Sequence, residues 1–248
     1  MLSPEEQKLY FWLTAIWARG CGDIVDLGCF AGGSTARLAQ GHAAARLGSR
    51  IHAFDRFTAD ESTKRRILYP AGIPTFTGND ILPLARRLLA PWAGAITFHA
   101  GEIEDNGWDR APIEILTCDA AKSASDADDI AGIFFPHLVP GHSVVVQQDQ
   151  MLWNQPWITA QMQLLARHFT PLAIVPESTV IHLCHSVPDA AALATARTAM
   201  LDDSALDGLL QQARAVLGPL GGAAALDRMS AAIRANPGER HAWNFERP

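Results

Sequence analysis

The sequence contains no long apolar segment and few cysteines. No apolar run approaches the roughly 18 residues of a membrane-spanning helix, and the N-terminus lacks the apolar core and small-residue cleavage site of a signal peptide. The four cysteines are scattered, with no C-x-x-C pair. We therefore expect a cytoplasmic protein that does not contact a membrane and whose thiols are reduced.

Positive charge is also scarce. Twenty Lys and Arg residues stand against 26 Asp and Glu residues, which gives a formal net charge of −6. Non-specific binding of nucleic acid needs a dense basic face, so we expect no nucleic-acid partner. The length of 248 residues is enough for one large domain, or for one domain with an appendage, and for a full core.

Short apolar segments alternate with helical ones along residues 1–187. Ser3 and Pro4 begin a helix predicted over residues 4–19. Predicted strands follow over residues 24–27, 51–55, 96–100, 112–119 and 143–149, and residues 172–175 and 179–184 resemble a closing β-hairpin. This order predicts an α/β fold: a Rossmann-like, doubly wound, mostly parallel sheet of seven strands with a terminal hairpin.

Residues 188–248 differ in composition from the rest of the chain. They are rich in alanine and predict two or three helices, broken at Gly218-Pro219 and at Gly221-Gly222, followed by an irregular tail from Pro237. We expect a helical C-terminal appendage to a domain of residues 1–187. It could pack on the sheet, cover the active site, or form a homo-oligomer through its helices.

The stretch from Asp23 to Thr35 is the most informative part of the chain. A short apolar strand runs through a turn that contains Gly28, Gly32 and Gly33 into a helix predicted over residues 34–40, which ends at Gly41. Glycines let a ligand approach the backbone, and the free N–H groups of the first helical turn point toward it. The spacing is not the G-x-G-x-x-G of dinucleotide-binding folds.

Acidic residues stand at the ends of the predicted strands, where ligands of open parallel sheets bind. Asp26 is placed to accept hydrogen bonds from an ammonium group, which with the glycine turn suggests S-adenosylmethionine rather than a pyrophosphate. Asp55 ends the second strand and is placed to accept from both ribose hydroxyls of an adenosine. Glu102 follows the third strand and could contact the adenine edge.

These motifs resemble those of the class I S-adenosylmethionine-dependent methyltransferases. Asp26-Leu-Gly-Cys-Phe-Ala-Gly-Gly-Ser34 is similar to the first motif of that family, and its aromatic residue before x-Gly-Gly-Ser is closest to the macrocin O-methyltransferase-like branch of natural-product pathways. Phe54-Asp-Arg-Phe57 resembles the second motif of the same branch. The resemblance implies that S-adenosylmethionine is held by Asp26, Gly28, Phe30, Gly32, Gly33, Ser34, Asp55, Arg56, Glu102 and Asp119.

Asp119 and Lys122, after the fourth strand, resemble a pair in the catechol and caffeoyl-CoA O-methyltransferases. There the Asp binds a divalent metal and the Lys is the general base. The partner Asp-Asn of those enzymes corresponds to Asp149-Gln150, so the resemblance implies an Mg²⁺ site of Asp119, Asp149 and Gln150. A metal-free enzyme with Asp119, Lys122 or a histidine as base is the alternative, and Lys122 as base needs a depressed pKa.

The sequence thus favours a methyltransferase that acts on a small-molecule hydroxyl, such as that of a natural product or a sugar. The alternative is a cofactor-binding or scaffold domain of the same fold that transfers no methyl group. His182 and Cys184 share one face of a predicted strand, but no second ligand pair at metal spacing lies near them. We interpret both as ordinary strand residues.

Overall fold

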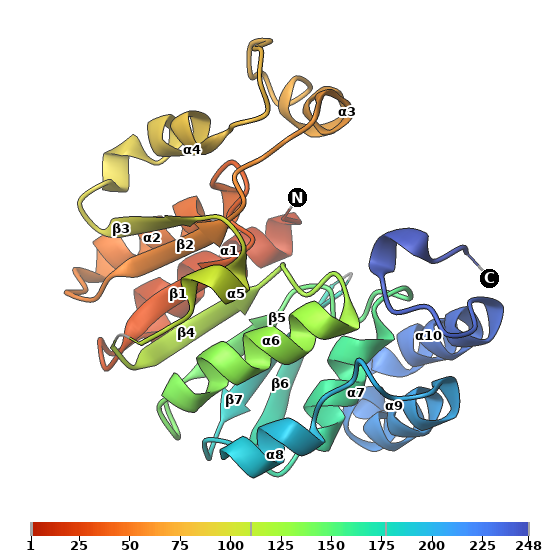
Figure 1. Ribbon diagram of the computed structural model, residues 1–248. Coiled ribbons are helices and arrows are strands. Elements are labelled where there is room, and N and C mark those ends of the chain that lie inside the picture. The colour runs from red at the N-terminus through yellow and green to blue at the C-terminus, as the bar shows by residue number, and fades with distance from the viewer. Residues whose placement is uncertain (1, 110, 177, 248) are drawn as a thin grey trace.

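The computed structural model describes residues 2–109, 111–176 and 178–247. Its strands form one seven-stranded sheet in the order β3-β2-β1-β4-β5-β7-β6 (Figure 1). The strands are β1 (Asp23–Leu27), β2 (Ile51–Asp55), β3 (Ile96–Ala100), β4 (Ile113–Cys118), β5 (Val144–Gln147), β6 (Phe169–Val175) and β7 (Thr179–Cys184). The first five are parallel, whereas β7 pairs antiparallel with both β5 and β6. The predicted sheet and its terminal hairpin are confirmed.

Helices cover both faces of the sheet, as Figure 1 shows. They are α1 (Pro4–Trp12), α2 (Gly33–Ala45), α3 (Glu61–Thr63), α4 (Leu82–Leu88), α5 (Ile103–Asn106), α6 (Ala124–Phe134), α7 (Pro156–Leu164), α8 (Ala190–Thr195), α9 (Asp203–Leu217) and α10 (Ala223–Ala235). One core layer joins α1, α2 and α4 to residues such as Ile24, and the other joins α6 and α7 to residues such as Val25. Neighbouring residues of β1 face opposite core layers, and both layers are buried. This is why apolar residues follow one another along the strand instead of alternating with polar ones.

The strand order reverses direction beside β1. The chain goes from β1 outward to β2 and β3, then returns to β4 on the other side of β1. In open α/β sheets a ligand binds outside the carboxyl ends of the strands at such a switch point. The loops after β1, β2 and β4 are therefore where a site is expected.

The prediction that a helix ends at Gly41 is wrong, since α2 continues to Ala45. Gly41 lies where α1 crosses α2, and a Cβ there would overlap the Thr14 hydroxyl and the Phe11 carbonyl. The Thr14 Oγ1 in turn donates to the Leu38 carbonyl at 2.8 Å. Glycine is needed here for close packing of two helices and not as a stop signal.

Replacing Gly41 by alanine is expected to lower the free energy of unfolding by about 1–3 kcal/mol, because the backbone of α1 must move away. The matched change Gly208→Ala in α9, where no atom lies within 4 Å of the added Cβ, should instead raise it by about 0.5–1 kcal/mol. Urea denaturation of both variants measures the two effects. Equal effects in the two helices would contradict the packing role of Gly41.

The C-terminal helices α9 and α10 pack on the flank of the sheet. Leu210, Leu226 and Met229 form one buried cluster with Ala160 of α7 and Val180 of β7. Their apolar faces thus contact this same chain, and the predicted homo-oligomer and the domain boundary after residue 187 stay predictions. Within the described ranges, no helix has both the length and the apolar character to cross a membrane.

The tail after α10 returns to the loop that follows β4. The Ala124 N–H donates to the Arg240 carbonyl at 3.0 Å, and the Ala242 N–H donates to the Lys122 carbonyl at 2.9 Å. The Phe245 ring lies near Trp153 and Trp157 as well. The tail therefore supports the segment that carries Lys122.

Candidate active site

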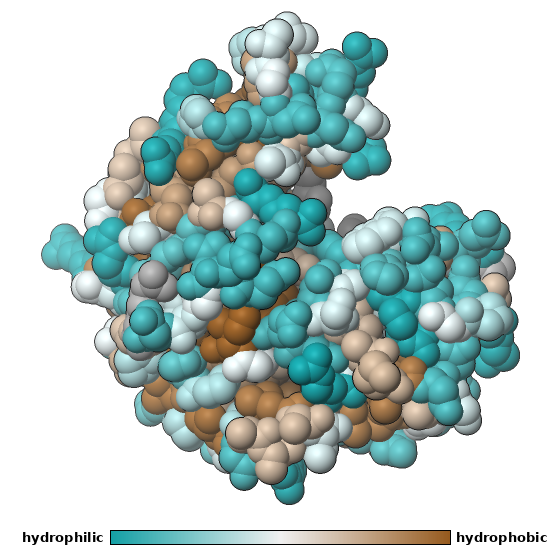
Figure 2. Space-filling model, viewed as in Figure 1, coloured by the Kyte–Doolittle hydropathy of each residue, from teal (hydrophilic) through white to brown (hydrophobic). Residues whose placement is uncertain are grey.

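Two cavities adjoin at the carboxyl ends of β1, β2 and β4. The smaller, of about 280 Å³, lies toward β3, α5 and α6, and the larger, of about 620 Å³, lies toward α1, the start of α2 and residues 63–67. They share Gly28, Phe30, Asp55 and Asp119. In the space-filling view the molecule is hollowed between the α3 segment and the C-terminal helices (Figure 2). The structure therefore brings four of the predicted site residues to one junction.

The loop after β1 has the conformation that its glycines allow. Gly28 and Gly32 have φ of 97° and 100°, and Phe30 has φ of 49°. A Cβ on Gly28 would lie 3.1 Å from the backbone of Asp119, so a side chain there would push the loops after β1 and β4 apart. A left-handed φ is unfavourable for phenylalanine, and such strain concentrates at functional sites.

Asp55 holds this strained loop. Its carboxylate accepts the Phe30 N–H at 2.9 Å and the Phe57 N–H at 2.6 Å, and Phe57 also has a left-handed φ of 54°. Burial raises the pKa of Asp55, although the two backbone N–H donors act in the opposite direction. Since a carboxylate offers about four acceptor sites, Asp55 can accept further bonds from a ligand diol.

Asp26 does not line either cavity. It is 2 % exposed and accepts from the hydroxyls of Ser34 at 2.7 Å, Thr35 at 2.5 Å and Thr117 at 2.7 Å. These bonds fasten the start of α2 to β4 beneath the loop. Direct contact of Asp26 with a ligand ammonium stays a prediction, and the sequence reading missed the two threonines.

Of the other predicted residues in the loop after β1, two line a cavity and one packs against a neighbouring segment. Gly33 and Ser34 line the larger cavity. Gly32 lines neither cavity, and a Cβ there would lie 2.9 Å from the Leu89 side chain of the neighbouring segment. Its glycine is explained by the left-handed turn that begins α2.

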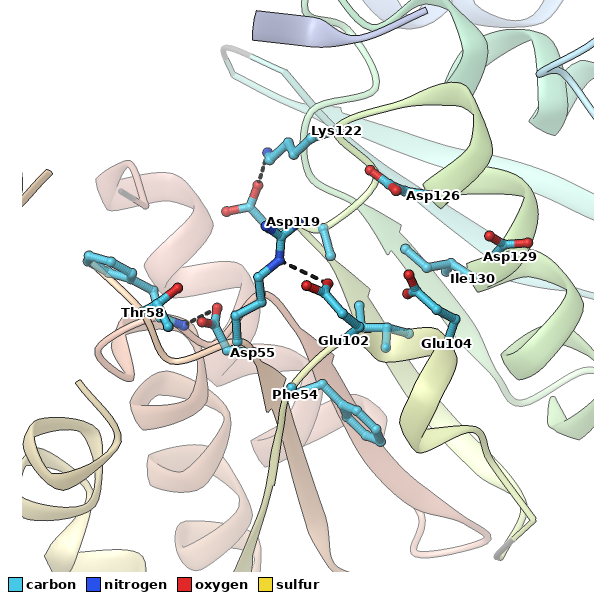
Figure 3. A pocket seen from close by; sticks show the side chains of 16 residues that line it. Phe54, Asp55, Thr58, Glu102, Glu104, Asp119, Lys122, Asp126, Asp129 and Ile130 are labelled. Carbon is cyan, nitrogen blue, oxygen red and sulfur yellow. Dashed lines mark hydrogen bonds and ion pairs between the residues drawn. The ribbon is translucent and has the colours of Figure 1, made fainter. Parts of the chain in front are cut away.

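Carboxylates surround the smaller cavity, as Figure 3 shows. Arg56 and Glu102 form an ion pair of 2.9 Å at its rim, with side chains 67 % and 46 % exposed, and such pairs add little stability. Glu104, Asp126 and Asp129 also line the cavity, and the sequence reading missed them. The sequence Gly101-Glu-Ile-Glu104 directly after the third strand was the available signal for Glu104.

Lys122 lies between two carboxylates. Its Nζ is 2.5 Å from Asp119 Oδ1 (Figure 3) and is also bonded to Asp149 Oδ2. Asp149 accepts a further bond from Gln155 Nε2 at 3.0 Å. The two carboxylates outweigh the burial of Lys122 and raise its pKa. Lys122 is therefore an ammonium at neutral pH, contrary to the depressed pKa that a lysine base needs.

The two carboxylates differ in their surroundings. Burial and the neighbouring Asp149 raise the pKa of Asp119 to about 6, against the charge of Lys122. Burial also acts on Asp149, but Lys122 and the Gln155 amide outweigh it and lower the pKa of that carboxyl. Two acids whose pKa values are pushed apart suit different roles.

The predicted metal ligands do not fit a Mg²⁺ ion in this arrangement. The Lys122 ammonium occupies the space between Asp119 and Asp149, and the Gln150 amide oxygen instead accepts from His182 Nε2 at 2.7 Å. Across residues 2–109, 111–176 and 178–247, no group of three or more His, Cys, Asp or Glu side chains is placed to hold a metal. Lys122 supplies positive charge where the ion would supply it.

The larger cavity contains polar residues that the sequence reading did not assign. Gln148 lines it, and the Tyr10 hydroxyl donates to its amide oxygen at 2.9 Å. This bond leaves the NH₂ end of Gln148 for a ligand. Arg37, one turn into α2, lines the same cavity and is held by Gln7 at 2.7 Å.

Neither a family model nor a curated protein matches the sequence. Solved structures do match its fold. The O-methyltransferase NovP aligns with a TM-score of 0.56 at 12% identity, over 73% of this chain and 80% of that one. Cofactor-bound Rv0187 from MTB aligns with a TM-score of 0.51 at 16% identity, over 75% and 82%. The protein thus has a seven-stranded Rossmann-like fold that it shares with the O-methyltransferase NovP.

Proposed function

We propose that this protein transfers a methyl group from S-adenosylmethionine to a hydroxyl of a small molecule, such as a natural product or a sugar. The observation that carries the proposal is the junction of two cavities at Gly28, Phe30, Asp55 and Asp119. NovP is an O-methyltransferase, which agrees with this reaction, and membership of the macrocin-like branch is part of the proposal.

The residues of the smaller cavity suit an adenosyl sulfonium. Asp55 has acceptor capacity for a ribose diol, and Gly28 leaves room that a Cβ would fill. Among the described residues, six carboxylates and two cations line the cavity: Asp55, Glu102, Glu104, Asp119, Asp126 and Asp129, with Arg56 and Lys122. This excess of negative charge favours a cationic ligand over a pyrophosphate.

S-adenosylmethionine supplies a methyl group on a good leaving group, so the protein has to orient the acceptor and exclude water. We assign acceptor binding to the larger cavity, where Gln148 offers an NH₂ donor. Asp119 lines both cavities, and its pKa of about 6 suits a general base at neutral pH. Lys122 is then a positioning residue that holds Asp119 and Asp149 in place.

The test is a binding and transfer experiment on the purified protein. Calorimetry with S-adenosylhomocysteine should show one site, and S-adenosylmethionine with a labelled methyl group should label at least one compound in a panel of phenols, sugars and aliphatic alcohols. No binding of either nucleoside at millimolar concentration would overturn the proposal. Binding without transfer across the panel would favour the scaffold function instead.

Activity is expected to survive chelation. The Lys122 ammonium bonds to both Asp119 and Asp149 and so occupies the position that a divalent ion between these carboxylates would take. Methyl transfer in excess EDTA should stay within about twofold of the untreated rate, whereas loss of a metal that ligates the acceptor should remove several kcal/mol of transition-state stabilisation. An activity lost in EDTA and restored by Mg²⁺ would contradict this arrangement.

A further inference from the structure

A third cavity lies apart from the candidate active site, between α7, the β6–β7 hairpin and α9. Its volume is about 160 Å³, and none of its lining residues lines the two cavities of the candidate active site. A cavity of about 150 Å³ with apolar walls is known to accept a benzene ring. The space is therefore enough for one small ring.

His182 of β7 lines this cavity with an unpartnered ring nitrogen. The side chain is 3 % exposed, and its Nε2 lies 2.7 Å from the Gln150 amide oxygen. Since a carbonyl oxygen only accepts, Nε2 carries the proton and Nδ1 is a bare acceptor. Among the described residues Nδ1 has no hydrogen-bond partner. Burial lowers the pKa of His182 to about 3, so the ring is neutral.

Both oxygens of the neighbouring Gln150 already accept hydrogen bonds. Gln150 accepts at its side-chain oxygen from His182, and its backbone carbonyl accepts the Thr159 hydroxyl at 3.0 Å. An unmet buried acceptor is unfavourable, and among the described residues that line this cavity His182 Nδ1 is the buried side-chain atom without a hydrogen-bond partner. A ligand that donates one hydrogen bond would meet it.

The walls and the rim of the cavity favour an aromatic ligand. Met162, Phe169 and Leu217 are buried and line it, and thioether and aromatic side chains pack well against aromatic rings. Met162 is flexible and unbranched, so its side chain can adapt to a bound ring. Val216 of α9, 44 % exposed, also lines the cavity and marks its opening to solvent.

We propose that this cavity is a second small-molecule site, which takes a small aromatic ring that bears a hydroxyl group. The hydroxyl donates to His182 Nδ1, and the ring packs against Met162, Phe169 and Leu217. A ligand in this place contacts both the hairpin and α9, so it joins the C-terminal helices to the sheet. The site is independent of methyl transfer.

Phenol and toluene test the proposal, because they present the same ring with and without the hydroxyl. Titrations followed by calorimetry and by NMR of the histidine ring nitrogens should show phenol binding about tenfold more tightly than toluene, with a shift of the His182 Nδ1 signal. The affinity for phenol should be the same with S-adenosylhomocysteine present. Equal affinities for the two rings, no binding of phenol, or displacement of phenol by S-adenosylhomocysteine would each overturn the proposal.

Two variants locate the ligand. Val216→Trp should abolish phenol binding by filling the opening, whereas the matched exposed change Leu88→Trp on α4 should leave it unaltered. His182→Phe should remove the preference for phenol over toluene. The Val216 variant alters only an exposed side chain, so it decides the question even where His182→Phe does not fold. Unchanged phenol binding in Val216→Trp would place the ligand elsewhere and overturn the proposal.

Discussion

Replacing Asp119 by asparagine is expected to lower kcat by about 10²–10⁴-fold, the range that positioned general acids and bases contribute. Asparagine keeps an oxygen that can accept from Lys122, so the geometry around the ammonium is preserved while the base is lost. Binding of S-adenosylhomocysteine should change little. The measurement is steady-state methyl transfer to an acceptor found in the screen, together with calorimetry.

The dependence of the rate on pH gives an independent check. The base must be deprotonated to act, and burial raises the pKa of Asp119 to about 6. In the wild type, kcat should therefore fall about tenfold per unit below pH 6 and be level above it. Asp129→Asn, which alters another carboxylate of the same cavity, serves as the control and should retain this profile. Full turnover in Asp119→Asn would remove Asp119 from the mechanism.

Asp55→Ala is expected to weaken S-adenosylhomocysteine binding by about 100-fold. The change removes the proposed acceptor of the ribose diol and releases the Phe30 and Phe57 N–H groups that stabilise two left-handed residues. Hydrogen bonds to a charged group contribute about 1.5–3 kcal/mol each, and about 2.8 kcal/mol corresponds to 100-fold in affinity. Calorimetry measures the loss directly.

Two further variants test whether the loss of affinity comes from the carboxylate of Asp55. Asp55→Asn keeps one oxygen acceptor and should lose less affinity than Asp55→Ala. Asp227→Ala, on the exposed face of α10, removes a carboxylate far from the cavities and should bind like the wild type. An Asp55→Ala protein that is folded and binds normally would show that this strand-end acid does not contact the nucleoside.

The sheet was predictable because its signals are local. Ile24, Val25 and Leu27 form a buried apolar strand whatever surrounds them, and a strand–turn–helix order leaves few topologies. The same local logic brings Gly28, Asp55 and Asp119 together, because the carboxyl ends of parallel strands share one edge. The prediction that Gly41 ends a helix was wrong because this glycine is needed for close packing against α1, and α1 is distant in the sequence.

The chemistry of the site was less predictable because it depends on side chains that meet only in the fold. The protonation of Lys122 follows from its contacts with Asp119 and with Asp149, which is 27 residues away. The direction of Gln150 follows from His182 on the hairpin. Neither contact leaves a pattern in the sequence. The resemblance to metal-dependent enzymes therefore suggested Asp119, Asp149 and Gln150 as metal ligands, whereas in the structure the two acids bond to Lys122 and Gln150 bonds to His182.

The tail that binds the Lys122 segment also bears on how the protein is made. Residues 240–245 leave the ribosome long after Lys122, and they supply the backbone partners of Ala124 and of the Lys122 carbonyl. A nascent chain that has already assembled its sheet would still lack these bonds. The backbone hydrogen bonds that hold the Lys122 segment are thus completed only after residues 240–245 have been made.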